Sequence, residues 1–309
     1  MVSLDKLDAV AAGMFPLKQQ VSLAGYTSYR VGGNAEWLSL PKTVDQLSAS
    51  LRWAARQNLS VTVLGAGSNL LISDRGLPGL VLCSRHLRQV YFDDVTGCIK
   101  AAAGEPLPNL AWKAARKGWR GLEWAVGVPG TVGGAVFMNA GAHGVSVADS
   151  LVTAEGVTLV GEPVCLSPET LRFAYRTSSL QSHFHLVTQA TFQLSPGHSP
   201  KVVLADTQAT LEKRRSAQPY HLPSCGSVFR NPPAHKAGWL IEQAGLKGYQ
   251  IGEAQVSPKH ANFIVNLGGA RAQDVLALIR YVQNQVAQQW SLHLHPEVRL
   301  LGDFEVCYL

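Results

Sequence analysis

Two glycine-rich segments carry the first sign of chemistry in this chain. The segment Gly65-Ala66-Gly67-Ser68-Asn69 directly follows an apolar run over residues 61–64. Glycine lets the backbone approach a ligand closely, and successive N–H groups can cradle a phosphate. The segment is not a dinucleotide fingerprint, because Leu70 stands where a third glycine belongs, and it lacks the Gly-Lys-Ser/Thr of a P-loop. Taken alone, it is equally typical of a tight turn between strands.

The second segment, residues 127–141, is the stronger signal. It reads Gly127-Val128-Pro129-Gly130-Thr131-Val132-Gly133-Gly134-Ala135 and continues to Met138-Asn139-Ala140-Gly141. A close-packed loop between strands would explain this density, but two glycine loops in one region favour the walls of a flat, phosphorylated cofactor. Residues 124–142 carry no formal charge over 19 residues, which is long enough to span a membrane. Pro129 and the glycines nevertheless make the stretch a poor helix.

Apolar periodicity and capping residues predict the elements that position these segments. Thr43 and Gln46 form a capping box before a helix that reaches about residue 58. Gly118 lies just past a second helix, and Ser167 and Pro168 are typical of a helix start. The predicted strands cover residues 61–64, 70–72, 80–82, 261–266 and 298–301, with weaker ones between 85 and 104. The further helices cover residues 108–117, 202–213, 239–244 and 274–289, and residues 195–200 form a linker.

Composition excludes several classes of protein. The chain has 309 residues, of which 46% are apolar and 16% charged, so it is too apolar to be intrinsically disordered. Lys and Arg number 27 against 21 Asp and Glu, which gives 27 − 21 = +6. These basic residues are scattered, and the densest cluster is Lys213-Arg214-Arg215. The balance favours a small anionic ligand over nucleic acid.

The cysteines predict a reducing compartment. There are five, namely Cys83, Cys98, Cys165, Cys225 and Cys307, without a C-x-x-C pair. An odd number at these spacings gives neither a disulfide framework nor a zinc site. The N-terminus lacks the basic start and apolar core of a signal peptide.

Several segments in the right order give a more specific reading than any one of them. Together they resemble the UDP-N-acetylenolpyruvoylglucosamine reductase (UDP-N-acetylmuramate dehydrogenase) family, from about residue 20 to the end. The segments are Tyr29-Arg30-Val31-Gly32-Gly33-Asn34-Ala35, residues 63–72, residues 121–144, Tyr175-Arg176-Thr177-Ser178, residues 225–232 and His295-Pro296-Glu297-Val298-Arg299.

The resemblance implies an α+β fold. It places a two-part FAD-binding domain of the vanillyl-alcohol-oxidase/PCMH type at residues 21–195, with lobes divided near residue 85. A smaller C-terminal α/β substrate domain follows at 201–309, and residues 1–20 form an N-terminal extension. The active site is expected between the two domains, where ligand sites often occur.

The family's reaction implies the cofactors and partners. NADPH reduces non-covalently bound FAD, which passes the hydride to the β-carbon of UDP-N-acetylglucosamine enolpyruvate in peptidoglycan precursor synthesis. The first glycine loop offers Ser68 and Asn69, neither of which attaches a flavin covalently, although His143 follows the second loop. We expect a cytoplasmic monomer, with no metal, nucleic acid or membrane partner.

The resemblance also assigns residues to the ligands. Those expected to bind the cofactor are Tyr29, Arg30, Gly65, Ala66, Gly67, Ser68, Asn69, Gly127, Pro129, Gly130, Gly133, Gly134, Asn139 and Gly141. Those expected to bind the substrate are Tyr175, Asn231, Lys259 and His260.

Three residues match the family's catalytic positions. Hydride addition leaves negative charge on the α-carbon and its carboxylate, so the reaction needs a fixed positive charge and an acid. Arg176 matches the catalytic arginine, whose guanidinium can grip a carboxylate through two hydrogen bonds. Ser227 matches the proton donor, and Cys225 beside it is a neighbour because the reduction needs no covalent attack. Glu297 matches the catalytic glutamate, although on a strand it could instead pair with Arg299 on the same face.

The chain is similar to the subtype of the family that lacks an extra segment with a substrate-covering tyrosine. Residues 175–178 run almost directly into His185, which leaves no room for that segment, and His260 stands where the other subtype carries glutamine.

Two other functions fit the same fold. A flavin oxidase acting on an alcohol or sugar would share the FAD loops but lack Arg176, Ser227 and Glu297 in these contexts. A non-catalytic nucleotide-sugar-binding protein would have kept the fold alone. Fold does not separate these readings, so the site must.

Overall fold

A computed structural model describes residues 15–304 of the chain. The predicted N-terminal extension therefore lies mostly outside the described residues, as does Cys307. The chain forms two compact units, each assembled from several segments. Unit 1 holds described residues 15–19, 37–66 and 78–213, and unit 2 holds residues 20–36, 67–77 and 214–304. The predicted domains follow chain order, whereas these units alternate along the sequence.

A helix and a four-stranded sheet begin the fold. The sheet has the order β1 (Leu17–Ser22), β2 (Asn34–Ser39), β5 (Leu77–Cys83), β3 (Val61–Leu64), and β3 pairs with β5 in parallel. Helix α2 (Val44–Arg56) starts at Thr43, whose hydroxyl accepts the N–H of Gln46 at 3.2 Å, as predicted. The buried side chains of Leu47 and Leu51 pack with Leu82 of β5. The 3-10 turn η1 (Ala24–Tyr26) lies between β1 and β2, and the 3-10 turn η2 (Ser84–His86) follows β5.

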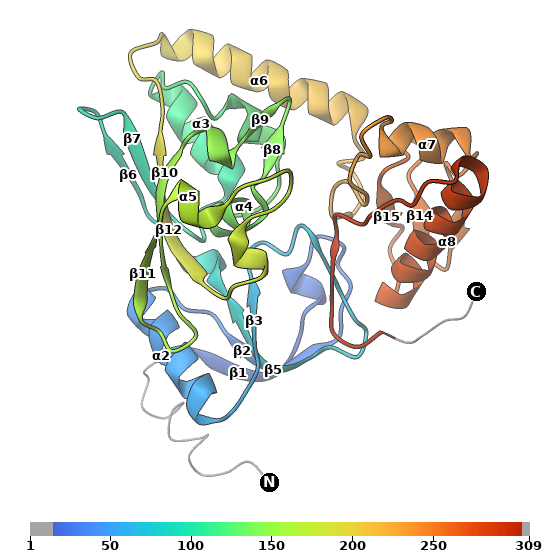
Figure 1. The fold of residues 1–309 in the computed structure, drawn as a ribbon, viewed down its shortest axis with the longest axis horizontal. Helices are drawn as coiled ribbons and strands as arrows, with labels where there is room; N and C mark the ends of the chain where they lie inside the picture. Colours follow the sequence, from blue (N-terminus) through green and yellow to red (C-terminus); the bar gives the residue numbers. More distant parts are fainter. Residues whose placement is uncertain (1–14, 305–309) are drawn as a thin grey trace. The chain divides into compact units, whose positions relative to one another are not determined.

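A five-stranded antiparallel sheet forms the centre of unit 1 (Figure 1). Its order is β11 (Pro163–Leu166), β10 (Leu151–Val157), β12 (Leu186–Gln193), β7 (Cys98–Ala102), β6 (Val90–Asp93). In the ladder between β12 and β7, Phe192 lies opposite Ile99 and Ala190 opposite Ala101. All four side chains are buried, so one face of the sheet is apolar and must be covered.

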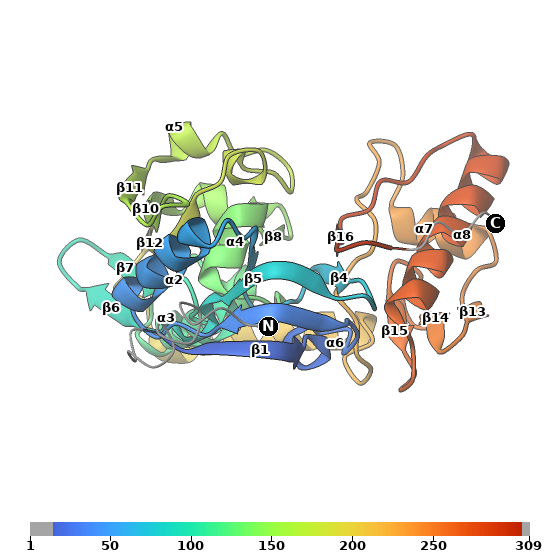
Figure 2. The same cartoon turned by 90° about the horizontal axis from the view of Figure 1, so that it is seen from below.

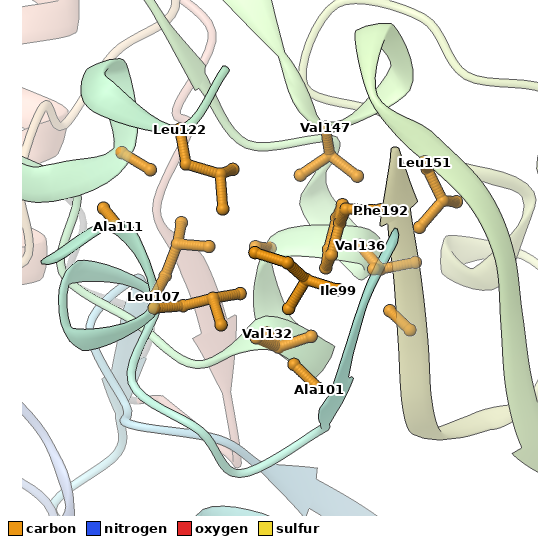
Figure 3. Packing of buried hydrophobic residues seen from close by; sticks show 14 of the residues in the cluster. Ile99, Ala101, Leu107, Ala111, Leu122, Val132, Val136, Val147, Leu151 and Phe192 are labelled. Atoms are coloured by element: carbon orange, nitrogen blue, oxygen red, sulfur yellow. The ribbon is translucent and has the colours of Figure 1, made fainter. Parts of the chain in front are cut away.

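Two helices cover that face, as Figure 3 shows. Leu107 and Ala111 come from α3 (Leu107–Arg116), and Val132 and Val136 come from α4 (Val132–Met138). Phe192 is fully buried among them, and burying such a side chain stabilises a fold by roughly 1.5–3 kcal/mol.

The glycine-rich segment is more helical than its composition predicts. It contains the 3-10 turn η3 (Glu123–Gly127) and α4, for which Thr131 is the N-cap. Packing of Val132 and Val136 against the sheet compensates for the poor helix propensity of Gly133 and Gly134. No helix within residues 15–304 has the length and apolar character needed to cross a membrane.

Short elements complete the loops of unit 1. They are β8 (Gly141–Ala142), β9 (Val145–Ser146), η4 (Val147–Asp149), α5 (Pro168–Leu171) and η5 (Ser179–Gln181). Ser167 caps α5 by accepting the N–H of Thr170, as predicted. His143 and Gly144, both with positive φ, form the two-residue turn between β8 and β9. Such turns require positive φ at both central residues.

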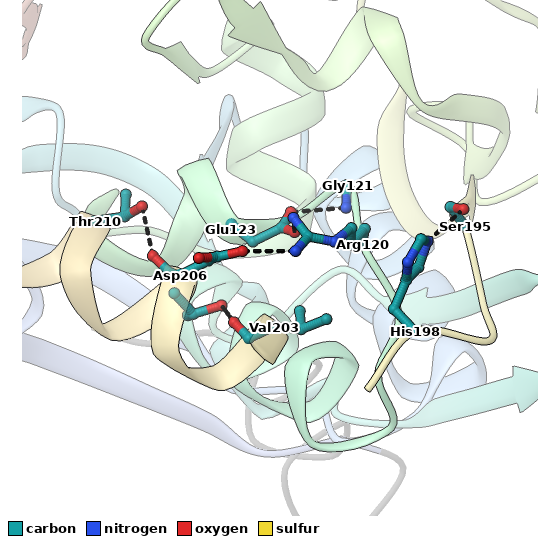
Figure 4. Close-up of polar contacts among 9 residues, drawn as sticks. Arg120, Gly121, Glu123, Ser195, His198, Val203, Asp206 and Thr210 are labelled. Atoms are coloured by element: carbon teal, nitrogen blue, oxygen red, sulfur yellow. Dashed lines mark hydrogen bonds and ion pairs between the residues drawn. The ribbon is translucent and has the colours of Figure 1, made fainter. Parts of the chain in front are cut away.

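Helix α6 (Pro200–Ala217) is longer than predicted, because it begins at the final proline of the linker. Proline is tolerated in the first turn of a helix, where its missing N–H has no partner to lose. Its residues Val203, Thr207 and Leu211 are buried, and most of its exposed residues are polar. Asp206 pairs with Arg120 at 2.6 Å, and Ser195 hydrogen-bonds His198 at 3.0 Å (Figure 4).

Unit 2 packs two helices and small sheets around its own core. The helices are α7 (Ala237–Gln243) and α8 (Ala272–Trp290), both visible in Figure 2. The strands β13 (Gln250–Ile251), β14 (Ala254–Val256) and β15 (Ile264–Asn266) form an antiparallel sheet, and β4 (Leu70–Ile72) pairs in parallel with β16 (Arg299–Leu301). Helix α8 starts two residues before its predicted position, because the Asp74 carboxylate accepts the N–H groups of Ala272 and Gln273.

Candidate active site

The two glycine segments meet in unit 1. A Cβ atom on Gly65, at the end of β3, would lie 2.6 Å from the hydroxyl oxygen of Thr131, the N-cap of α4. Two carbonyls of the first loop accept side-chain hydrogen bonds. The Cys83 thiol donates to the Gly65 carbonyl, and the Arg85 guanidinium donates to the Ala66 carbonyl. The sequence left open whether these loops are neighbours, and the fold brings them into contact.

Backbone donors around this contact fit a phosphorylated cofactor. Among residues 15–304, the N–H groups of Gly65, Ala66 and Gly130 donate to no protein acceptor. Each of these residues is only partly buried. Several N–H groups that lack a protein acceptor and lie close together can form a concave site for an anion. The diphosphate of FAD requires such a site.

The predicted glycines of the second segment divide into two groups. A Cβ on Gly133 would lie 2.9 Å from the Cβ of Ala103, and one on Gly141 would lie 2.5 Å from the Val145 carbonyl, so packing explains both. Gly130 has φ +143°, which favours glycine. A Cβ on Gly134 would meet nothing closer than Thr131 at 3.5 Å, so packing does not require glycine there. Gly127 is buried at the end of η3, and Pro129 is exposed.

The side-chain amide of Asn139 is hydrogen-bonded within the protein. It is buried in the left-handed conformation, with φ +43°. Its amide donates to the Ala174 carbonyl at 3.0 Å and accepts the Ala148 N–H at 3.0 Å. The side chain predicted to bind the cofactor therefore joins the end of α4 to the turn that carries Arg176.

That turn holds Arg176 in an unusual backbone conformation. Ala174 and Thr177 exchange backbone hydrogen bonds, and Arg176 between them has φ +55°. Gln181 donates to the Arg176 carbonyl at 3.0 Å, and the guanidinium donates to the Gly141 carbonyl at 2.9 Å. The guanidinium lies over the ring of Tyr175, 5.0 Å from its centroid, while Tyr175 itself is exposed. A non-glycine residue at positive φ is strained, and such strain clusters at functional sites.

In unit 2, the two predicted cofactor residues near the N-terminus differ in burial. Tyr29 is fully buried in the core next to Cys225, and burial raises the pKa of its hydroxyl well above the ordinary value. Its side chain therefore does not face solvent or a cofactor. Arg30, which follows it, is exposed with φ +58°.

The rest of the first glycine loop is hydrogen-bonded to Glu297 and to Arg299, the first residue of β16. Asn69 donates from its side chain to the Glu297 carbonyl at 3.1 Å and accepts the Arg299 N–H at 3.0 Å. Gly67 has φ +67° and lies against the Tyr26 carbonyl, so no side chain fits there. Ser68, between them, is half-buried. This loop and the candidate glutamate are therefore neighbours through Asn69.

Ser227 and Glu297 are linked through one residue. The Val228 carbonyl accepts the N–H of Glu297 at 2.7 Å, so the serine turn lies beside the segment that leads into β16. Gly226 precedes Ser227 with φ +82°, a conformation that favours glycine. The Ser227 hydroxyl is partly exposed and has no hydrogen bond to protein within residues 15–304. It is thus available to a ligand.

Cys225, two residues before Ser227, is buried at 3% exposure. Burial, with a smaller contribution from the nearby Glu297 charge, raises the pKa of its thiol to about 12. The reactive form of cysteine is the thiolate, which is negligible here at neutral pH.

The predicted substrate residues form local contacts in unit 2. Asn231 accepts the N–H of Ala237 at the start of α7, and Lys259 donates to the Arg215 carbonyl at 2.7 Å. His260 is half-buried, and burial lowers its pKa. Its Nδ1 accepts the Asn262 N–H at 3.2 Å.

Two neighbouring arginines, Arg230 and Arg299, were not predicted as site residues from the sequence. The pKa of Arg299 is lowered, mainly by burial and then by repulsion from Arg230. The Nε of Arg230 is buried without a hydrogen-bond partner in the described residues. Two partly buried guanidinium groups of like charge fit an anionic ligand. Both residues lie inside motifs quoted above, but nothing in the sequence indicates that they adjoin.

Comparison with known proteins agrees with this arrangement. The family model described as UDP-N-acetylenolpyruvoylglucosamine reductase, C-terminal domain, matches residues 218–301, and the FAD binding domain model matches residues 35–167. A UDP-N-acetylenolpyruvoylglucosamine reductase of Nostoc sp. is 57% identical over 94% of this chain and 87% of its own length. One of Synechococcus elongatus is 56% identical over 94% of this chain and 96% of its own. The chain belongs to the UDP-N-acetylenolpyruvoylglucosamine reductase family.

A solved structure of the family has the same fold. The crystal structure of the Thermus caldophilus UDP-N-acetylenolpyruvylglucosamine reductase (MurB) superposes with a TM-score of 0.80 at 37% identity. The match covers 93% of this chain and all of the other. The predicted family and the predicted combination of an FAD-binding domain with a reductase C-terminal domain are therefore confirmed. The chain is an oxidoreductase whose cofactor is FAD.

Proposed function

We propose that this enzyme reduces UDP-N-acetylglucosamine enolpyruvate to UDP-N-acetylmuramate with NADPH, in peptidoglycan precursor synthesis. Support comes from relatives that carry the reductase name over nearly the whole chain. The observation that carries the proposal is the turn of Ser227, whose hydroxyl is available and whose neighbour Val228 bonds the backbone of Glu297. An acid and a carboxylate held together in this way suit proton delivery to a carbanionic centre.

The cofactor would be held by the two glycine loops, with Gly65, Ala66 and Gly130 offering backbone N–H groups to its phosphates. FAD held there would supply hydride transfer between NADPH and the β-carbon of the substrate.

The side chains then manage the charge that this leaves on the α-carbon and its carboxylate. The Arg176 guanidinium binds the carboxylate and stabilises the enolate electrostatically. Ser227 donates its hydroxyl proton to the α-carbon and is reprotonated from solvent. Glu297 orients the serine and the intermediate. One hydride and one proton are added across the double bond, so the balance is complete.

An anaerobic absorbance titration tests the proposal. The purified protein is expected to be yellow, to bleach with NADPH and to recover its colour with UDP-N-acetylglucosamine enolpyruvate. Recovery with oxygen alone would instead favour an oxidase. A colourless protein that takes up no FAD would leave the nucleotide-sugar-binding alternative.

The serine assignment needs its own variant. Ser227→Ala is expected to leave bleaching by NADPH within about twofold and to slow recovery by at least tenfold, a typical contribution of general acid catalysis being about 10²–10⁴-fold. Ser224→Ala, three residues earlier, is the matched control and should behave like the unaltered protein. Equal recovery rates in both variants would show that Ser227 is not the donor.

We further propose that the enzyme acts as a cytoplasmic monomer. An odd number of cysteines suits a reducing compartment, and the described ones are free. Light scattering coupled to size exclusion should give the mass of one 33.2 kDa chain. A mass of two or more chains at micromolar concentration would overturn the monomer.

A further inference from the structure

Asn262 is a buried asparagine whose polar groups converge on the residues that follow Ser227. It is 4% exposed and lies just before β15. Its backbone carbonyl accepts the Val228 N–H at 2.9 Å. Its side-chain oxygen accepts the Phe229 N–H at 2.9 Å, and its side-chain nitrogen donates to the Phe229 carbonyl at 2.8 Å. Three hydrogen bonds thus fix two consecutive residues.

The orientation of Ser227 must be set by the residues that follow it, Val228 and Phe229. Gly226, on its other side, has φ +82° and no heavy atom within 4 Å of where a Cβ would stand. Glycine gives the chain no preference there, because it populates positive and negative φ about equally. The conformation of the turn is therefore determined where Val228 and Phe229 are bound.

The opposite edge of the same segment is bound to Pro296 and Glu297, which precede β16. The Val228 carbonyl accepts the Glu297 N–H, and Phe229 forms a bridge with Pro296. Asn262 and Glu297 thus form hydrogen bonds with residues 228–229 on opposite edges. On the glutamate edge the bonds are between backbones, whereas on the Asn262 edge two of three depend on one side-chain amide.

Asn262 is itself held in place. Its own N–H donates to Nδ1 of His260 at 3.2 Å, and the strand β15 begins two residues later. A buried amide cannot replace lost partners with water. The two hydrogen bonds between the Asn262 side chain and the Phe229 backbone therefore have one stable geometry. An asparagine supplies the donor and the acceptor that this arrangement needs, and an aspartate would supply only acceptors when ionised.

We infer that Asn262 is a positioning residue for Ser227: by fixing Val228 and Phe229, it holds the serine hydroxyl where it delivers its proton. The inference rests on the proposed function, because it assumes that Ser227 is the donor.

Separate measurement of the two half-reactions tests it. In Asn262→Ala, flavin reduction by NADPH should stay within twofold, and reoxidation by UDP-N-acetylglucosamine enolpyruvate should slow at least tenfold. Asn262→Asp keeps the size and one acceptor but loses the donor to Phe229, so it should show the same selective loss. Amide hydrogen exchange at Val228 and Phe229 should speed up at least tenfold in both variants, independently of turnover.

Asp274→Ala is the matched control for general destabilisation. Asp274 is buried in the same unit and caps α8 through Arg271, away from the serine turn. It should lower the melting temperature without changing the ratio of the two half-reaction rates. If Asn262→Ala lowers both rates equally, as general loosening would, the positioning role is wrong.

A double variant separates positioning from an independent effect. If Asn262 acts through Ser227, adding Asn262→Ala to Ser227→Ala should slow reoxidation less than twofold further. A further tenfold loss would overturn the inference while leaving the proposed function intact. If Ser227→Ala alone leaves reoxidation unchanged, the assigned donor is wrong and the proposed mechanism fails with it.

Discussion

Arg176 combines a permanent charge with a strained backbone. Its positive φ is maintained by Asn139 and Gln181, which bind the backbone of its turn. Two side-chain amides, one buried and one half-buried, thus fix the turn that carries the guanidinium. A fixed turn suits a group that must meet a carboxylate at a fixed angle.

Arg176→Lys tests the need for the planar guanidinium. The lysine keeps the charge and meets the same backbone strain, but it cannot form two parallel hydrogen bonds. We expect kcat to fall at least about tenfold with little change in melting temperature, since a lost charge-assisted hydrogen bond contributes about 1.5–3 kcal/mol. Arg172→Lys, at another arginine with positive φ (44°), is the control and should retain full activity. Near-normal kcat in Arg176→Lys would contradict bidentate binding.

His260 makes stability depend on pH. Burial lowers its pKa in the folded protein, so the unfolded chain, with a pKa of about 6.5, takes up the proton first. As pH falls below about 6.5, the unfolded state is favoured by at most about 1.4 kcal/mol per pH unit. Above that pH the group is neutral in both states and has no effect.

Thermal unfolding between pH 7.5 and 5.5 measures this dependence. The unaltered protein should lose more stability on acidification than His260→Gln, which has no proton to gain. His183→Gln removes an exposed histidine and should leave the pH dependence unchanged. Identical pH profiles for all three proteins would show that His260 titrates normally.

At the scale of elements, α4 contains two adjacent glycines with opposite surroundings. Gly133→Ala brings a Cβ to 2.9 Å from Ala103, and overpacking of this kind destabilises by about 1–3 kcal/mol. Gly134→Ala meets only Thr131 at 3.5 Å, so the FAD-free protein should gain up to about 1 kcal/mol from helix propensity.

The same pair locates the cofactor. If FAD lies against α4, Gly134→Ala should weaken FAD binding at least tenfold while the apoprotein becomes more stable. Fluorescence titration with FAD, alongside thermal unfolding of the apoprotein, gives both quantities. Unchanged FAD affinity in Gly134→Ala would remove Gly134 from the cofactor site.

Elements with local signals could be predicted from the sequence, and those without could not. Thr43 and Ser167 cap their helices as predicted, because a cap depends on residues three positions away. The start of α8 was misplaced, because the carboxylate that accepts its first N–H groups belongs to Asp74, 198 residues before Ala272. Asn262 escaped notice for the same reason, since its partner Phe229 is 33 residues away.

At the scale of the molecule, the chain order does not give the compact units. The core of unit 2 includes Tyr29, Val31 and Leu71 together with C-terminal residues, and β4 pairs with β16. Family motifs could be read in order along the chain, but the partners of each segment depend on long-range pairing.

A fragment of residues 214–309 should therefore not fold by itself. It lacks Tyr29, Val31 and Leu71, and it leaves β16 without its parallel partner. We expect weak secondary structure and no cooperative thermal transition by circular dichroism, with the full chain as the reference. A sharp transition in the fragment would show that the C-terminal residues form an autonomous domain.

The burial of Cys225 has a practical consequence for labelling the enzyme. Its thiol pKa of about 12 and 3% exposure make it inert to maleimides near neutral pH, and Cys83 is also buried with a raised pKa. Among the cysteines of residues 15–304, Cys165 on β11 is the exposed one, so a dye should attach there before it reaches Cys83 or Cys225. Peptide mapping after brief labelling should find Cys165 modified and Cys225 intact. A fluorophore can then report on unit 1 while the serine turn stays chemically untouched.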